Sequence, residues 1–97
     1  MKYLEKNNLE EELNDDITLV DFFATWCGPC KMMDNTLQEL DDKYNIVKVD
    51  TDKFNDIAFK YRIMSIPTIL VFKNKELIKE IVGFQSAIDL ENKIKED

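Results

Sequence analysis

The stretch ITLVDFFA, residues 17–24, constrains the fold of this chain more than any other segment. It is apolar at both odd and even positions and is rich in β-branched and aromatic residues. Successive side chains of a strand point to opposite faces, so this pattern predicts a strand that is buried on both sides. Such a strand needs other layers packed on both faces of its sheet. Its one charged residue, Asp21, would then lie where a lone carboxylate is costly to bury.

Helix and strand patterns alternate after this strand. Beyond residue 27, apolar side chains recur at steps of three and four, which is the spacing of one stripe of an amphipathic helix. The segments NIVKVD (45–50) and TILVF (68–72) predict further strands. Residues 54–61 predict a helix between those two strands.

The last part of the chain predicts a hairpin followed by a helix. Asn74 and Lys75 fit a tight turn, because asparagine tolerates a positive φ. ELIKEIV, residues 76–82, would then be the antiparallel partner of the preceding strand. Ser86, with Asp89 three residues later, is typical of the start of a helix.

Two shorter elements are expected at the N-terminus. KYL, residues 2–4, predicts a short edge strand. Asn8, with Glu11 three residues later, predicts a short helix that carries Leu9 and Leu13 on one face.

The expected element order is therefore β-α-β-α-β-α-β-β-α. Early β-α-β units imply parallel strands with right-handed crossovers, and the late hairpin adds antiparallel strands. We expect an α/β fold with a central mixed sheet of four to five strands, flanked on both faces by four helices. With only 97 residues, the range 1–97 is expected to form a single domain.

Charge and hydropathy exclude several functions. The net charge of −7 argues against binding to nucleic acid and to anionic membrane surfaces, both of which favour basic faces. The first residues lack the apolar segment of a secretory signal, and no apolar run is long enough to cross a bilayer. We therefore expect a cytoplasmic protein, in a reducing compartment where a structural disulfide would gain little.

Both cysteines of the chain lie in TWCGPC, residues 25–30. A structural zinc site needs four cysteine or histidine ligands, and the chain has no histidine. Haem attachment needs a histidine after the second cysteine, where Lys31 stands. An iron–sulfur cluster would have to share thiolates between chains. No metal or other cofactor is expected, which leaves a redox pair or two inert buried thiols.

The position of the motif favours a redox pair. Cys27 would lie at the N-terminus of a helix, where the helix dipole and free N–H groups stabilise a thiolate. Cys30 follows one turn later, within reach of a disulfide. Pro29 suits the first helical turn and stiffens it, while Gly28 leaves the Cys27 sulfur open. Trp26 either packs in the core or forms a rim beside the reactive sulfur.

Asp21 lies six residues before Cys27, on the strand that leads into the motif. A buried carboxylate has a raised pKa or a charge partner, so Asp21 is a candidate acid and base for thiol chemistry. Lys48 on the neighbouring strand is a candidate partner. The alternatives are an aspartate on an exposed edge strand and a solvated lysine. Pro67, in SIPT, is either ordinary strand punctuation or a cis proline.

Four segments occur in the order of a known family: VDFFATWCGPCKMM, IVKVDTDK, SIPTILVFKN and IVGF. Over essentially its whole length the chain resembles the thioredoxin family, and WCGPC with a downstream IPT is a specific combination. The resemblance implies a thioredoxin fold and a protein-disulfide reductant, an oxidoreductase whose only redox group is the Cys27–Cys30 pair.

The resemblance also implies a role for each matching residue. Cys27 would be the exposed nucleophile that attacks a substrate disulfide, and Cys30 the resolving thiol. Asp21 would handle the Cys30 proton, with Lys48 as its partner. Pro67 would be the cis proline of the family.

A shallow apolar groove for an extended substrate segment is implied as well. Its residues would be Trp26, Gly28, Pro29, Ile66, Pro67, Gly83 and Phe84. The expected partners are a thioredoxin reductase and proteins with disulfides, with the chain itself a monomer.

The chain departs from the family pattern at four positions that could affect the choice of partner: Phe23, Asn35, Met64 and Lys75. Glutaredoxins differ in a tyrosine-containing motif and in glutathione contacts that this sequence lacks. Two alternatives stay open. Disulfide oxidases and isomerases share C-x-x-C but often have histidine between the cysteines. A scaffold that binds a partner, with incidental redox activity, is the alternative of a different class.

Overall fold

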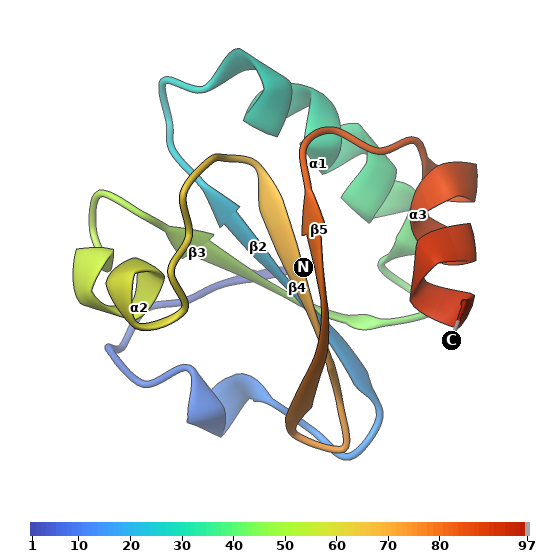
Figure 1. Ribbon diagram of the computed structural model, residues 1–97, viewed down its shortest axis with the longest axis horizontal. Coiled ribbons are helices and arrows are strands. Elements are labelled where there is room, and N and C mark those ends of the chain that lie inside the picture. Colours follow the sequence, from blue (N-terminus) through green and yellow to red (C-terminus); the bar gives the residue numbers. More distant parts are fainter. Residues whose placement is uncertain (97) are drawn as a thin grey trace.

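The computed structural model describes residues 1–96, which form a five-stranded sheet with helices on both faces (Figure 1). The strands are β1 (Lys2–Tyr3), β2 (Ile17–Phe23), β3 (Asn45–Asp50), β4 (Thr68–Lys73) and β5 (Glu76–Val82). The helices are the 3₁₀ helix η1 (Glu10–Glu12) and the α-helices α1 (Gly28–Leu40), α2 (Asn55–Lys60) and α3 (Ala87–Lys95).

Strand β2 lies at the centre of the sheet, whose order is β1-β3-β2-β4-β5. It pairs in parallel with β3 and antiparallel with β4, so the sheet is mixed, as expected. The register sets Asp21 opposite Lys48 on β3 and Ile69 on β4. Every residue of β2 except Ile17 is buried, which confirms a strand covered on both faces.

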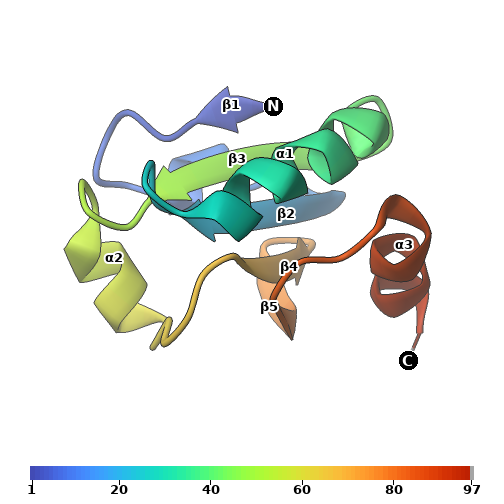
Figure 2. The ribbon, with the colours of Figure 1, turned by 90° about the horizontal axis from the view of Figure 1, so that it is seen from above.

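Two helical layers cover the sheet (Figures 1 and 2). Helices α1 and α3 lie on one face, and α2 with η1 lies on the other. Alternate residues of β2 join opposite cores: Leu19 packs with the α1 and α3 side chains, while Val20 and Phe22 pack with those of α2. Among residues 1–96, no helix is both long and apolar enough to span a bilayer.

The prediction of four helices is wrong in one detail, because η1 is a single 3₁₀ turn. Leu9 occupies its N-cap position and no side chain caps it, so the expected start at Asn8 does not form. The chain becomes extended again at Leu13, with ψ of 144°. Leu9 and Leu13 are both buried nonetheless. Because an isolated helical turn has little stability, the burial of these two leucines holds the segment in place.

The predicted hairpin turn is confirmed. Asn74 and Lys75 join β4 to β5 with φ of 55° and 67°, so both adopt the left-handed backbone conformation. Asparagine tolerates this conformation, whereas lysine is disfavoured there by its β-carbon.

Replacing Lys75 by glycine should therefore raise the free energy of unfolding by up to about 1 kcal/mol, because glycine has no β-carbon to disfavour the left-handed backbone conformation. Urea denaturation would measure the change. Lys73→Gly is the control: this residue ends β4 outside the left-handed region, so the substitution should destabilise by about 0.5–1 kcal/mol. A loss of stability in Lys75→Gly comparable to the control would contradict the prediction.

Candidate active site

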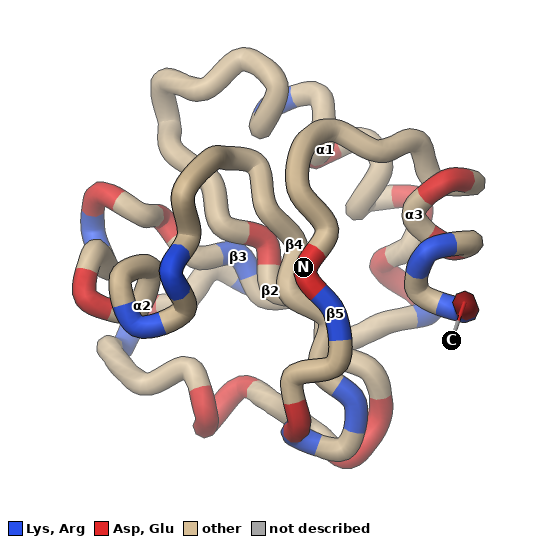
Figure 3. Tube along the Cα trace, viewed as in Figure 1, with Lys and Arg blue, Asp and Glu red and all other residues tan. Residues whose placement is uncertain are grey.

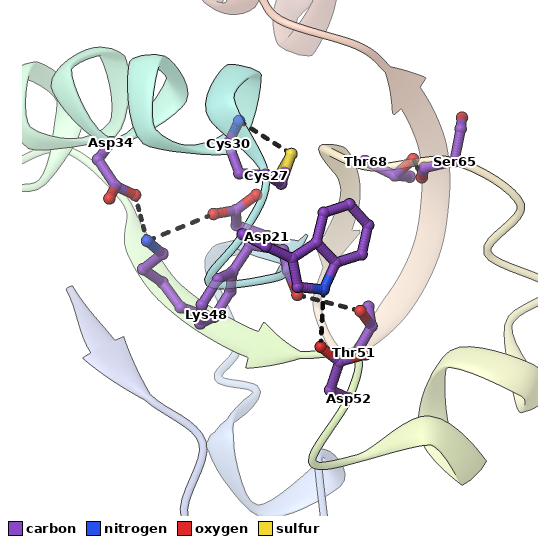
Figure 4. The surroundings of a disulfide bond; sticks show 11 residues. Asp21, Cys27, Cys30, Asp34, Lys48, Thr51, Asp52, Ser65 and Thr68 are labelled. Atoms are coloured by element: carbon purple, nitrogen blue, oxygen red, sulfur yellow. Dashed lines mark hydrogen bonds and ion pairs between the residues drawn. A yellow bond between two sulfur atoms is a disulfide. The ribbon is translucent and has the colours of Figure 1, made fainter.

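The two cysteines join the end of the central strand to the first turn of α1. Cys27 is the N-cap residue, and its Sγ accepts a hydrogen bond from the Cys30 backbone N–H at 3.2 Å. The two residues form a disulfide, with their Cα atoms 5.3 Å apart. Pro29 lies in the first turn, as expected. The helix N-terminus therefore directs a backbone donor at the Cys27 sulfur (Figure 4).

Cys27 is less exposed than expected. In the disulfide form only 5% of its surface is accessible, against 2% for Cys30. Both pack in a small apolar cluster with Phe23 and Ala24, and Ile66 leans against it. A β-carbon placed on Gly28 would meet no atom within 4 Å, so the space outside the motif is open.

Two further loops lie beside the motif. The Ile66–Pro67 peptide bond is cis, which settles the isomer that the sequence left open. The backbone N–H of Gly83 donates to the Pro67 carbonyl at 2.8 Å, so the loop after β5 is tied to the loop before β4. Gly83 has φ of 90°, which favours glycine. Phe84 follows it and is 43% exposed.

Trp26 lies on the surface and not in the core. It is 71% exposed, and its indole Nε1–H donates to Asp52 Oδ2 at 3.0 Å (Figure 4). We did not predict Asp52. The sequence did carry a signal for it. Asp52 follows β3, and because parallel strands end at the same edge of a sheet, a residue after β3 lies near the end of β2 and the cysteine motif.

Three segments that meet around the cysteines carry no charged residue, although the chain has a net charge of −7. Residues 22–30, 63–72 and 81–88 contain no lysine, arginine, aspartate or glutamate. Figure 3 shows these loops as an uncharged stretch of the trace at one end of the sheet. Met64, at 92% exposed, is the most accessible large apolar side chain there.

Asp21 is fully buried beneath α1. Neither of its carboxylate oxygens has a hydrogen-bond partner among residues 1–96. Burial raises the pKa of Asp21 to about 7, although the nearby Lys48 ammonium acts in the opposite direction and Asp34 adds to the rise. The carboxyl group therefore gains or loses its proton close to neutral pH, which suits an acid and base.

Lys48 is the predicted neighbour of Asp21 and is also buried. Its Nζ lies 3.8 Å from Asp21 Oδ2, so the alternative of a solvated lysine is wrong. The same Nζ forms an ion pair with Asp34 of α1 (Figure 4). It also lies over the Phe23 ring, 4.5 Å from the centroid. Burial lowers the pKa of Lys48, but its bond to Asp34 and the charge of Asp21 outweigh this, and its pKa is raised.

Asp34 was missed in the sequence. It lies four residues after Cys30, and side chains at that spacing share one face of a helix. The apolar stripe that begins at Cys30 marked the face turned toward the sheet, so an acidic residue beside that stripe was a detectable signal. Among residues 1–96, no group of three histidine, cysteine, aspartate or glutamate residues is placed to hold a metal ion.

Asp21→Asn should stabilise the oxidised protein at about pH 8 by up to about 4 kcal/mol, and by little at about pH 4. With a folded-state pKa of about 7 against an ordinary value of 3.8, the folded state binds the proton more tightly than the unfolded state. The stability of the wild type therefore falls as pH rises between these two pKa values. The amide of Asp21→Asn cannot ionise, so the variant does not lose stability in this way. Urea denaturation at both pH values measures this. An equal effect at the two pH values would contradict it.

Comparison with known proteins gives a consistent result. A scan of protein families matches residues 1–96 to the thioredoxin family. The thioredoxin of Staphylococcus saprophyticus is 47% identical over 83 residues, covering 81% of this chain and 80% of that protein. That of Bacillus subtilis is 49% identical over 78 residues, covering 76% and 75%.

Solved structures agree with the sequence comparison. The reduced thioredoxin of Schistosoma mansoni superposes with a TM-score of 0.84 at 40% identity, covering 97% of this chain and 94% of that one. A mutant thioredoxin from Halobacterium salinarum gives a TM-score of 0.86 at 28% identity, covering 98% and 87%. Taken with the paired cysteines, these similarities do not favour an oxidase, an isomerase or a scaffold. The chain therefore belongs to the thioredoxin family, and it is a thiol–disulfide oxidoreductase of the type that reduces protein disulfides.

Proposed function

We propose that Cys27 is the attacking thiol and Cys30 the resolving thiol of the disulfide exchange. In the reduced protein, the Cys27 thiolate attacks one sulfur of a substrate disulfide, and the other sulfur leaves as a thiolate. The Cys30 thiolate then attacks the Cys27 sulfur, and the second substrate thiolate leaves. The Cys27–Cys30 disulfide forms, and two electrons have passed to the substrate.

One observation carries this assignment of roles. The Sγ of Cys27 caps α1 and accepts the Cys30 N–H, so the positive end of the helix dipole and a backbone donor both favour a thiolate at Cys27. Cys30 lies one turn further on and is the more deeply buried of the two, which suits a thiol that reacts only with its neighbour.

Asp21 is proposed to exchange the proton of Cys30, with Lys48 as its charge partner. To attack, Cys30 must lose its proton, and Asp21 is the one buried carboxylate among residues 1–96. A carboxyl group whose pKa is about 7 accepts a proton readily at neutral pH and returns it in the reverse step.

The substrate is proposed to lie along the uncharged surface beside the disulfide. An extended segment would run against the backbone at Ile66 and Pro67, bounded by Trp26, Gly28, Pro29, Gly83 and Phe84. Backbone hydrogen bonds of this kind give affinity with little sequence selectivity. Apolar side chains and the absence of charge suit many different disulfide-bearing proteins.

Membership of the family supports three further proposals. Residues 1–97 are proposed to act as one domain and as a monomer in the cytoplasm. A thioredoxin reductase is proposed to return the disulfide to the dithiol. No cofactor is needed besides the cysteine pair, because both electrons reside on its two sulfurs.

Cys27→Ser should abolish reduction of a protein disulfide, whereas Cys30→Ser should still attack and then stop at the mixed disulfide. Insulin reduction with dithiothreitol as the electron source measures the first effect. Mass spectrometry of the non-reduced Cys30→Ser protein, incubated with a disulfide-bearing substrate, measures the second. Retained activity in Cys27→Ser, or adducts formed by Cys27→Ser and not by Cys30→Ser, would reverse the assignment.

Asp21→Asn should slow the resolving step near neutral pH by up to about 100-fold, because an amide accepts no proton. In the wild type the rate should rise as pH passes through about 7, where Asp21 loses its proton. Stopped-flow measurement of oxidation by a model disulfide over this range gives both rates. The same rate and pH profile in the variant would rule out the proton role.

A further inference from the structure

The Lys48 ammonium is shared between two carboxylates, and it favours the outer one. Its Nζ is bonded to Asp34 on α1 but lies 3.8 Å from Asp21, beyond hydrogen-bond distance. Asp21, the more deeply buried of the two, is left without a hydrogen bond. If the role of Lys48 were only to neutralise a buried charge, its ammonium would be expected to bond to Asp21. The more deeply buried carboxylate would be stabilised most by a hydrogen-bonded cation.

Asp34 reaches Lys48 from a position open to water. Its side chain is 32% exposed, whereas that of Lys48 is 2% exposed. A cleft of about 270 Å³ opens at this place, and its lining includes Tyr3, Cys30, Lys31, Asp34 and Lys48. Asp34 therefore lies beside a solvent-connected cleft that extends to the resolving cysteine.

We propose that Asp34 is a positioning residue, which holds the Lys48 ammonium away from Asp21 and so leaves the buried Asp21 carboxyl group without a hydrogen-bonded cation. Asp34 acts through Lys48 and does not touch the sulfurs. This inference rests on the proposed role of Asp21 only for its effect on catalysis, because the position of Lys48 and the ionisation of Asp21 can be tested separately.

Few other charges act at this place. The titratable and charged side chains that face the Asp21 and Lys48 pair are Tyr3 on β1, with its ring 5.1 Å from Lys48 Nζ, and Cys30, Lys31 and Asp34 on α1. On β4, the residue paired with Asp21 is the apolar Ile69. Asp34 is thus the one carboxylate, among residues 1–96, that competes with Asp21 for Lys48.

The direct test measures the ionisation of Asp21 by carbon-13 NMR of its carboxyl group in the oxidised protein, from about pH 4 to pH 9. In Asp34→Asn, Lys48 loses its ionised partner and is free to pair with Asp21. The titration midpoint of Asp21 should then fall by about 1 pH unit or more, the effect of an opposite charge at close range. The pH profile of the resolving step should move in the same direction.

Two matched variants isolate the cause. Asp34→Glu keeps a carboxylate that can hold Lys48, so it should restore most of the wild-type midpoint. Glu39→Gln removes an exposed negative charge from the same helix without touching Lys48, so it should leave the midpoint unchanged. If Asp34→Asn folds poorly, Asp34→Ala provides the same loss of charge.

The outcomes separate this inference from the proposed role of Asp21. An unchanged or higher Asp21 midpoint in Asp34→Asn overturns the positioning role of Asp34, whatever the catalytic rates. An equal fall of the midpoint in Glu39→Gln also overturns it, because a general loss of negative charge would then be the cause. A lower midpoint with an unaltered rate profile, together with full activity in Asp21→Asn, supports Asp34 and refutes catalysis by Asp21.

Discussion

The burial of β2 on both faces is the constraint on which the rest of this structure depends. Its odd and even residues anchor two separate cores, so helices must cover both sides of the sheet. The strand cannot end in a wide turn without exposing those cores, and it passes within a few residues into α1. Cys27 lies at this junction, where it is the N-cap of the helix. The sulfur of the proposed attacking thiol is therefore placed by the same packing that stabilises the fold.

The same strand also carries a group whose burial is energetically costly, the carboxyl group of Asp21. Asp21 takes a position that packing alone would assign to an apolar side chain, and its pKa rises accordingly. The buried Lys48 and the partly exposed Asp34 of α1 complete a group of three charged side chains with Asp21. Such a group is weak support for stability, because the cost of removing charges from water offsets their attraction. The proposed proton transfer at Cys30 would account for such a group next to the disulfide, at some cost in stability.

Charge is absent from the chain segments that meet around the disulfide. Three uncharged segments meet around the disulfide (Figure 3), and charged residues lie at their margins: Asp52 bonds to Trp26, and Asp34 lines the cleft beside Cys30. Trp26 and Met64 project from this surface. In the proposed substrate site, an apolar contact area of this kind suits partners of varied sequence.

Sequence alone determined the elements, their order, the mixed sheet and the position of Cys27, because hydrophobic period, turn residues and caps act over a few neighbouring residues. It failed at η1, where a capping pattern at Asn8 was overridden by the burial of Leu9 and Leu13. Only the tertiary structure decided the cis isomer at Pro67 and the partners that converge from distant segments. Asp34 is 14 residues from Lys48 in sequence, and which carboxylate holds the ammonium depends on how closely α1 packs on β3. That distance is a property of the packed layers, and no local pattern of residues encodes it.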